Sequence, residues 1–462
     1  MSVTIHNAGQ NRLSTLSRLA LPAILEQILT TMVNYVDTAM VGSLGAWATA
    51  AVAINQPPVN LINNLILALS VGFTALIARY LGAGEPETAR KLVRCAVSLS
   101  VLIGVPLSLL CMALSRQIPA LLGAGEDILE PAAGYFFING AGMLFKSLTV
   151  VFTAIFRGYG DTRTPLYINT FVNLLNVVGN FFLIYPARTA TLFGREVFLW
   201  GAGWQVQGAA AATALSTVVG GVIMAVMLFS KHSGIGVSPK GCFGWDGHLL
   251  RLVWHISFPA MLERVTLNLG QMAQTAILTG LGTVALAASH LSLTAESLGY
   301  TPGFAFSVAA TTLVGQALGA EKPELAHRYG QICCRVAVFI MCFAGLGMFL
   351  FAPQIIGLFS NDPEVIAWGV KCLKMVAVIQ PVQIIPIVLT GVLRGAGDTK
   401  WAFYIVCCTM WIIRVLGSWA AVHLLDMGLL ACQFAMCCDM CARAVFFTIR
   451  FRRGKWKTAV NW

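Results

Sequence analysis

The chain has 462 residues, of which 57% are apolar and only 11% are charged, and its mean hydropathy is +0.77. So few charged residues cannot cover the surface of a water-soluble domain of this length, and the composition therefore excludes a soluble globular protein. The formal net charge is +11, but the basic residues gather in loops and helix ends, so we expect a lipid bilayer and no nucleic acid as the partner.

Apolar runs long enough to cross a bilayer follow one another along the whole chain. A spanning helix needs about 20 mostly apolar residues, whereas the strands of a membrane β-barrel show only about ten residues of alternating polarity. The runs therefore predict twelve transmembrane helices. They are expected at 17–43, 46–78, 92–115, 130–156, 164–186, 205–230, 253–281, 284–318, 328–351, 366–393, 401–423 and 427–450.

The basic residues predict the orientation of these helices. When alternate loops are assigned to the two sides of the membrane, most Lys and Arg residues fall on the side of both termini and the 231–252 segment. The other side holds mainly Arg116, Arg188 and Arg195. By the positive-inside rule, we expect a multi-pass protein of the cell (cytoplasmic) membrane with both termini in the cytoplasm.

The two halves of the sequence repeat each other. Adding 237 to a position in the first half gives its counterpart in the second, as for Pro22 and Pro259, and the segments 157–163 and 394–400 match most clearly. Each half holds an even number of crossings, so both enter the membrane in the same orientation. We therefore predict an all-α integral membrane fold, in which two six-helix bundles are related by a pseudo-two-fold axis along the membrane normal. The predicted bundles are 1–235 and 253–462, joined by a cytoplasmic linker at 236–252.

The repeated loops at 157–163 and 394–400 carry glycine turns that admit two interpretations. The glycines permit a tight turn, and Asp161 can cap the helix that follows, with Asp398 doing the same in the second half. Alternatively, Arg157 or Arg394 pairs across the bundles as a cytoplasmic gate. The other repeated glycine loops, at 82–86 and 319–323, lack the lysine and spacing of a Walker motif, so ATP is not the energy source within this chain.

Polar residues inside the first apolar run form one stripe. Glu26, Thr30, Asn34 and Asp37 fall on one helical face at about 100° per residue, and such a stripe must face the bundle interior or a central cavity. A charge at membrane depth costs at least ~2.5 to 3.5 kcal/mol, so each acid is a candidate functional residue. Pro22, four residues before Glu26, is expected to act as a hinge in this helix.

A second polar stripe lies in the fifth apolar run, where Asn173, Asn176 and Asn180 share a face. With Asp37 and Thr213, these amides predict a compact proton or sodium site in the N-terminal bundle, because amides coordinate cations and steady a carboxylate. The alternative is that the asparagines only join helices. No metal is expected apart from Na+ at Asp37.

The second half offers a different set of polar candidates. Glu263 and Glu296 lie inside apolar runs, and Gln274 occupies the position equivalent to Asp37, so a second acidic site would have to use one of those glutamates. Asp439 lies nearer a membrane edge. His290 and Lys146 are weaker candidates, because such side chains also snorkel or satisfy a neighbour.

Several of these segments together resemble the multidrug and toxic compound extrusion (MATE) family. The resemblance rests on Pro22 with the segment 36–42, on the two Arg-Gly-x-Gly-Asp-Thr-like loops, and on the stretches 299–303 and 314–319. Their order over twelve helices covers essentially the whole chain. The resemblance implies an antiporter, not an enzyme, that exports organic cations and other amphipathic compounds by alternating access in exchange for H+ or Na+, without a cofactor.

The resemblance also implies that Asp37, Asn176, Asn180 and Thr213 match the family's cation site. Some relatives have a second acid where Asn180 stands, so the choice between H+ and Na+ stays open. Substrate is expected between the bundles against aromatic and methionine side chains, and the protein is expected to work as a monomer.

Two other classes of protein compete with this interpretation. A flippase for lipid-linked saccharides or metabolites, of the same superfamily, would need a cluster of cavity-facing cations, and Lys146, Arg264 and Arg414 are sparse for that purpose. An intramembrane transferase would need carboxylate clusters or a catalytic His with acids nearby, and the sequence shows neither.

Overall fold

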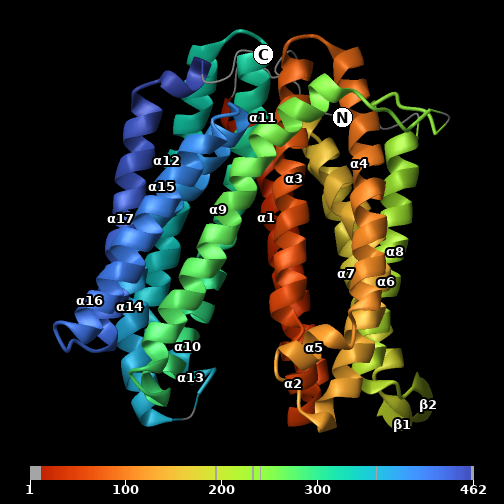
Figure 1. Ribbon diagram of the computed structural model, residues 1–462, viewed down its shortest axis with the longest axis vertical. Helices are drawn as coiled ribbons and strands as arrows, with labels where there is room; N and C mark the ends of the chain where they lie inside the picture. The colour runs from red at the N-terminus through yellow and green to blue at the C-terminus, as the bar shows by residue number, and fades with distance from the viewer. Residues whose placement is uncertain (1–11, 193–194, 231–233, 240, 361, 459–462) are drawn as a thin grey trace.

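The structure, a computed structural model, describes residues 12–192, 195–230, 234–239, 241–360 and 362–458 (Figure 1). Residues 231–233 and 240 of the predicted cytoplasmic segment therefore lie outside the described residues. In the described residues, ten helices are long and apolar enough to cross a membrane. α9, which carries Glu263 and Arg264, and the broken pair α10 and α11 complete the twelve crossings.

The first half consists of six crossings and a small hairpin. Its elements are α1 (Arg12–Gly42), α2 (Ala46–Ala53), α3 (Gln56–Gly82), α4 (Pro86–Ala113), α5 (Gln117–Leu121), α6 (Glu126–Gly158), α7 (Arg163–Leu183), β1 (Pro186–Leu192), β2 (Arg195–Ala202) and α8 (Gln205–Phe229).

The second half repeats the order of helices without the hairpin. Its elements are α9 (Gly247–Thr279), α10 (Thr283–Tyr300), α11 (Gly303–Gly319), α12 (Pro323–Leu350), α13 (Ala352–Gly357), α14 (Pro363–Gly395), α15 (Thr399–Cys408), the π-helix η3 (Thr409–Leu416), α16 (Gly417–His423), α17 (Leu429–Arg452) and the 3₁₀-helix η4 (Lys455–Thr458). α9 begins at Gly247, inside the predicted linker, because the Asp246 carboxylate caps it by accepting from two backbone N–H groups.

The crossing predicted at 46–78 is confirmed as one apolar span, Trp47–Gly82, but a break divides it into α2 and α3. α2 ends at Ala53, and Pro57 and Pro58 stand in the first turn of α3. Asn55 stabilises the break, because its amide donates to the carbonyls of Ala51 (3.0 Å) and Ala132 (2.9 Å). A buried backbone carbonyl freed by a helix break needs such a partner.

Three further departures concern the other predicted runs. The run at 284–318 is broken before Gly303, where Pro302 has no N–H to continue the helix. The antiparallel strands β1 and β2 occupy a segment for which no structure was predicted. The run at 401–423 contains the π-helical η3, and such irregular turns frequently mark functional positions.

The two bundles meet at one end and diverge toward the other. Figure 1 shows α1 beginning and α17 ending at the upper end, where α3 lies beside α9 and α11, whereas the bundles spread apart toward the lower end. Hydrogen bonds join the halves: Ser257 Oγ donates to the carbonyl of Leu69 (3.0 Å), and Thr312 Oγ1 donates to the carbonyl of Arg157 (2.9 Å). The structure therefore shows a conformation closed at the upper end.

A symmetric glycine contact makes this closure tight. Gly82 of α3 packs against the backbone of Gln316, and Gly319 of α11 packs against the backbone of Arg79, with both pairs related by the 237-residue offset. A Cβ on either glycine would overlap a backbone carbonyl oxygen that cannot move away cheaply. The two bundles can therefore approach this closely only with glycine at these positions.

We predict that Gly82→Ala opens the upper end. Overpacking costs about 1–3 kcal/mol, and here the cost falls only on the closed conformation. Spin labels at positions 87 and 324, in the equivalent first turns of α4 and α12, should therefore report a longer distance in the variant. Gly347→Ala is the control, because a Cβ there meets nothing within 4 Å. An unchanged label distance in Gly82→Ala would contradict the prediction.

Candidate functional site

The membrane-depth carboxylates divide into those with a cationic partner and those without one. Glu26 pairs with Arg157, Glu263 pairs with Arg394, and Asp439 is bound by Arg443 and lies near Arg414. Within the part of the chain that the structure describes, Asp37 and Glu296 have no salt bridge. Three of these acids are therefore already paired with an arginine. Asp37 and Glu296 are the two that remain available to bind an ion.

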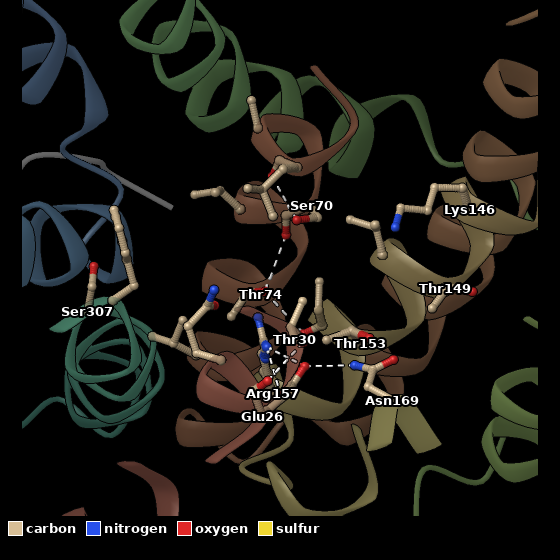
Figure 2. Close-up of a pocket in the computed structure, with 18 of the residues that line it drawn as sticks. Glu26, Thr30, Ser70, Thr74, Lys146, Thr149, Thr153, Arg157, Asn169 and Ser307 are labelled. Carbon is tan, nitrogen blue, oxygen red and sulfur yellow. Dashed lines mark hydrogen bonds and ion pairs between the residues drawn. The ribbon is translucent and has the colours of Figure 1, made fainter. Parts of the chain in front are cut away.

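Two of the ion pairs are equivalent by the internal repeat. Arg157 Nη2 lies 3.0 Å and 3.1 Å from the two carboxylate oxygens of Glu26, and Asn169 donates to the same carboxylate at 2.7 Å (Figure 2). In the second half, Arg394 Nη2 lies 3.1 Å and 3.2 Å from the carboxylate oxygens of Glu263. The alternative in which Arg157 or Arg394 pairs across the bundles was therefore wrong, because each arginine pairs with a glutamate of its own half.

The loops that carry these arginines differ in how their aspartates are used. The Asp161 carboxylate accepts from the backbone N–H groups of Arg163 (3.0 Å) and Thr164 (3.1 Å), so it caps α7 as predicted. Asp398 does not cap α15. Its carboxylate binds Arg450 of α17 at 2.8 Å, and burial raises the pKa of Asp398 although the guanidinium opposes that shift.

Asp37 lies at one end of a chain of polar side chains from three helices. The Asn180 amide donates to the Asp37 carboxylate and lies 3.4 Å from the Asn176 carbonyl oxygen, while the Asn176 amide donates to Thr213 Oγ1 at 3.0 Å. Asn180 is fully buried, and its side-chain carbonyl oxygen has no hydrogen-bond partner among the described residues. A free acceptor beside an unpaired carboxylate suits a cation or a proton on that carboxylate.

This cluster opens onto a cavity of about 590 Å³ inside the N-terminal bundle. Asn34 and Lys146 line the same cavity. Asn173 lines it as well, and its amide also donates to Thr30 Oγ1 (3.3 Å) and so joins α7 to α1. For Asn173, the helix-joining alternative describes the contact that the structure shows.

The equivalent region of the C-terminal bundle is occupied by a cationic side chain. The carbonyl oxygens of Gln271 and Gln274, the counterparts of Asn34 and Asp37, both accept from Arg414 of η3. Arg414 in turn lies 3.9 Å from Asp439, and Arg443 completes that buried cluster. At the counterpart of Asp37, the C-terminal bundle therefore has an amide that is already bound to the Arg414 guanidinium. Because that contact occupies its oxygen, Gln274 is not available to a mobile cation.

The remaining candidates take separate positions. Glu296 is buried and accepts from Gln383 (2.6 Å), and its other carboxylate oxygen has no partner among the described residues. It lines a cavity of about 230 Å³ in the C-terminal bundle together with Glu263. His290 is exposed and does not line either bundle's cavity described above.

A further cavity of about 550 Å³, the central cavity, lies between the bundles (Figure 2). Its described lining carries many hydroxyl groups and aliphatic side chains, and among those residues Phe304 is the one aromatic and none is a methionine. The sequence-based expectation of aromatic and methionine walls was therefore wrong for this cavity. Basic side chains also line it, namely Lys146, Arg157, Arg264 and Arg394.

Pro22 lies inside the continuous helix α1, four residues after Arg18. Because proline has no N–H, the Arg18 carbonyl lacks its helical donor, and Thr162 Oγ1 lies within 3.5 Å of it. The loop between α6 and α7 thus contacts the weakened turn of α1.

Comparisons with known proteins agree with the internal repeat. A family model described as MatE matches residues 22–182 and again residues 259–420, two segments whose starts differ by the same 237 residues. A probable multidrug resistance protein NorM from Thermotoga maritima is 30% identical over 449 residues, covering 96% of this chain and 92% of that protein. An FAD transporter from Shewanella oneidensis is 25% identical over 357 residues, covering 76% of this chain and 75% of that protein.

The fold also matches solved structures. The structure of a multidrug resistance MATE family transporter in an outward-facing conformation superimposes with a TM-score of 0.87 at 22% identity. The match covers 96% of this chain and 97% of that chain. At this level of identity, the likeness establishes the arrangement of twelve helices in two bundles.

Proposed function

The chain belongs to the multidrug and toxic compound extrusion (MATE) family of multi-pass membrane transporters, and we propose that it is a secondary active antiporter that exports amphipathic compounds in exchange for H+ or Na+. The observation that carries the proposal is the Asp37 cluster. Among the described residues, the Asp37 carboxylate has no cationic partner, and Asn180 holds it beside a cavity within the N-terminal bundle. Such a group can take up and release a small cation, which is what coupling requires.

The proposed transport cycle uses the two-bundle architecture. If the basic upper end faces the cytoplasm, as the positive-inside rule predicts, the bundles in this conformation diverge toward the outside. We propose that substrate leaves the central cavity on that side, and that occupation of the Asp37 cluster by the ion favours the return to the opposite conformation. Each half contributes to the cavity, so one chain suffices for the cycle and we propose a working monomer.

The proposal is energetically sufficient without ATP. A membrane potential supplies about 2.3 kcal/mol per charge per 100 mV, so one net inward charge sustains a substrate gradient of the order of fiftyfold. The named relatives include both a multidrug resistance protein and an FAD transporter, so family membership alone leaves the substrate class open.

The test is efflux of fluorescent compounds from cells that express the protein. We expect efflux to stop when a protonophore collapses the proton gradient or when sodium is withdrawn, and the treatment that acts identifies the coupling ion. Efflux that persists under both treatments would contradict ion-coupled antiport.

We also propose that Pro22 is a hinge of α1, and we predict that Pro22→Ala slows transport several-fold without destabilising the protein. Alanine restores the missing hydrogen bond, and it is about 3 kcal/mol more favourable than proline inside a helix. The efflux rate and the melting temperature of the purified variant check both parts. Pro106→Ala in α4 is the control, since that proline lies outside the cavities described above. A Pro22→Ala variant with wild-type efflux would contradict the proposed hinge.

A further inference from the structure

We propose that the central cavity selects amphipathic anions, and that the anionic group is held between Lys146 of α6 and Arg264 of α9. This inference rests on the proposed function and names the substrate class of its transport cavity. It differs from the organic cations that family resemblance implies.

The charged side chains that line the central cavity are mostly positive. Four of them are cationic and one, Glu26, is anionic. Glu26 is already paired, because its carboxylate accepts from both Arg157 and Asn169. Arg394 is balanced by Glu263. A cationic substrate therefore finds no free carboxylate here, and Phe304 is the one aromatic face of this lining that could attract it.

Lys146 and Arg264 have no carboxylate partner among the residues that the structure describes. Figure 2 shows the Lys146 amine directed into the space between the lining side chains. Asp37 lines the N-terminal cavity together with Lys146, but its described hydrogen bond is to Asn180. An unpaired cation at membrane depth is costly, and a substrate anion would supply the missing counter-charge.

The two unpaired cations, Lys146 and Arg264, each line two cavities. Lys146 lines both the central cavity and the N-terminal cavity, and Arg264 lines both the central cavity and the C-terminal cavity. One cation thus comes from each bundle, at the place where the central cavity joins that bundle's own cavity. An anion that binds both bridges the two halves, and relative movement of the bundles in the transport cycle would separate its two contacts.

The remaining lining fits the rest of an amphipathic molecule. Leu67, Val71 and Val150 offer aliphatic contact, while Ser307 offers a hydroxyl group. Export of an anion is also driven by an inside-negative membrane potential, which opposes export of a cation.

The test compares two dyes that share a xanthene ring, anionic fluorescein and a cationic rhodamine ester. Equilibrium binding to the purified protein in nanodiscs needs no ion gradient, so it is independent of coupling. We expect fluorescein to bind more tightly than the ester, and Lys146→Gln or Arg264→Gln to weaken fluorescein binding about tenfold each. Lys91→Gln is the matched control, because Lys91 is exposed and outside the cavity.

Charge-conserving variants protect the test against a folding defect. Lys146→Arg and Arg264→Lys should keep most of the fluorescein affinity. The proposal is overturned if the ester binds and fluorescein does not, or if the Gln variants bind fluorescein like the wild type. Efflux that proves independent of ion gradients, with anion binding intact, would instead contradict only the proposed antiport.

The same negative charge could belong to a phospholipid headgroup, and a separate measurement distinguishes that source. Proteoliposomes that carry a trace of fluorescent phosphatidylglycerol report lipid movement between leaflets by quenching with dithionite. We expect no protein-dependent movement of the lipid. Lipid movement without fluorescein binding would overturn the assignment of a small-molecule anion.

Discussion

Asp37→Asn is expected to abolish ion-driven efflux while the protein remains folded. Asparagine has nearly the same shape, and its side-chain carbonyl can still accept from the Asn180 amide, so the contact between α1 and α7 is kept. The charge that attracts a proton or Na+ is lost. An interaction with a charged group contributes about 1.5–3 kcal/mol, so coupled efflux should fall at least tenfold, as measured with a fluorescent substrate at equal expression.

Two variants control this prediction. Asp127→Asn removes an exposed carboxylate at the start of α6 and should leave efflux unchanged. Glu296→Gln removes the other membrane-depth acid that lacks an ion pair. If Asp37→Asn exports normally and Glu296→Gln does not, the coupling site belongs to the C-terminal bundle.

The second large effect is a loss of stability when one of the two equivalent glutamate–arginine pairs is broken. Glu263→Gln leaves the Arg394 guanidinium without its counter-charge, and the two side chains are only 6% and 12% exposed. Breaking a buried pair from one side costs about 3–5 kcal/mol, because one charge stays buried and unpaired. Glu26→Gln should cost less, since Arg157 is 21% exposed to the central cavity. The melting temperature of the purified protein measures both.

A double variant that removes both charges distinguishes two causes of lost stability. One is the loss of the ion pair itself, and the other is the cost of leaving one charge buried and unpaired. The double variant Glu263→Gln, Arg394→Gln should recover part of the lost stability, because no charge is left unpaired. Glu130→Gln is the control: its pair with Arg116 has a similar N–O distance of 3.0 Å, but both side chains are 71% exposed. That variant should show no measurable change. A double variant as unstable as the sum of its singles would contradict the account.

The internal repeat is the feature that sequence predicted best. The offset of 237 identified Glu26 with Glu263 and Arg157 with Arg394 as counterparts, and the family model matches both halves at that spacing. Sequence did not show that each glutamate pairs with the arginine of its own half. That pairing depends on how α1 packs beside α7 and so brings Glu26 within reach of Arg157, a contact between segments more than a hundred residues apart.

The polar cluster around Asp37 was also predictable, because helical periodicity places Asn176 and Asn180 on one face. The arrangement of the C-terminal bundle was not. Gln274 signalled the absence of an acid, but only the structure shows Arg414 in contact with it. Arg414 lies in a π-helical turn, which shifts the face that side chains present and which ordinary helical periodicity does not predict.

The cations of the central cavity were visible in the sequence but open to another interpretation. Lys146 inside an apolar run is equally consistent with a side chain that snorkels to the membrane surface. Two observations favour the cavity: Lys146 has no partner carboxylate among the described residues, and it lines the same central cavity as Arg264. Both depend on tertiary structure.

The most direct test of ion-coupled antiport is to record ion movement itself. Proteoliposomes loaded with substrate and with a fluorescent indicator of internal H+ or Na+ are diluted into substrate-free buffer, so that substrate flows outward down its gradient. The account predicts that this outflow draws H+ or Na+ inward through the wild-type protein, and that Asp37→Asn shows no such ion uptake. Substrate outflow from the wild type with no accompanying ion entry would contradict it.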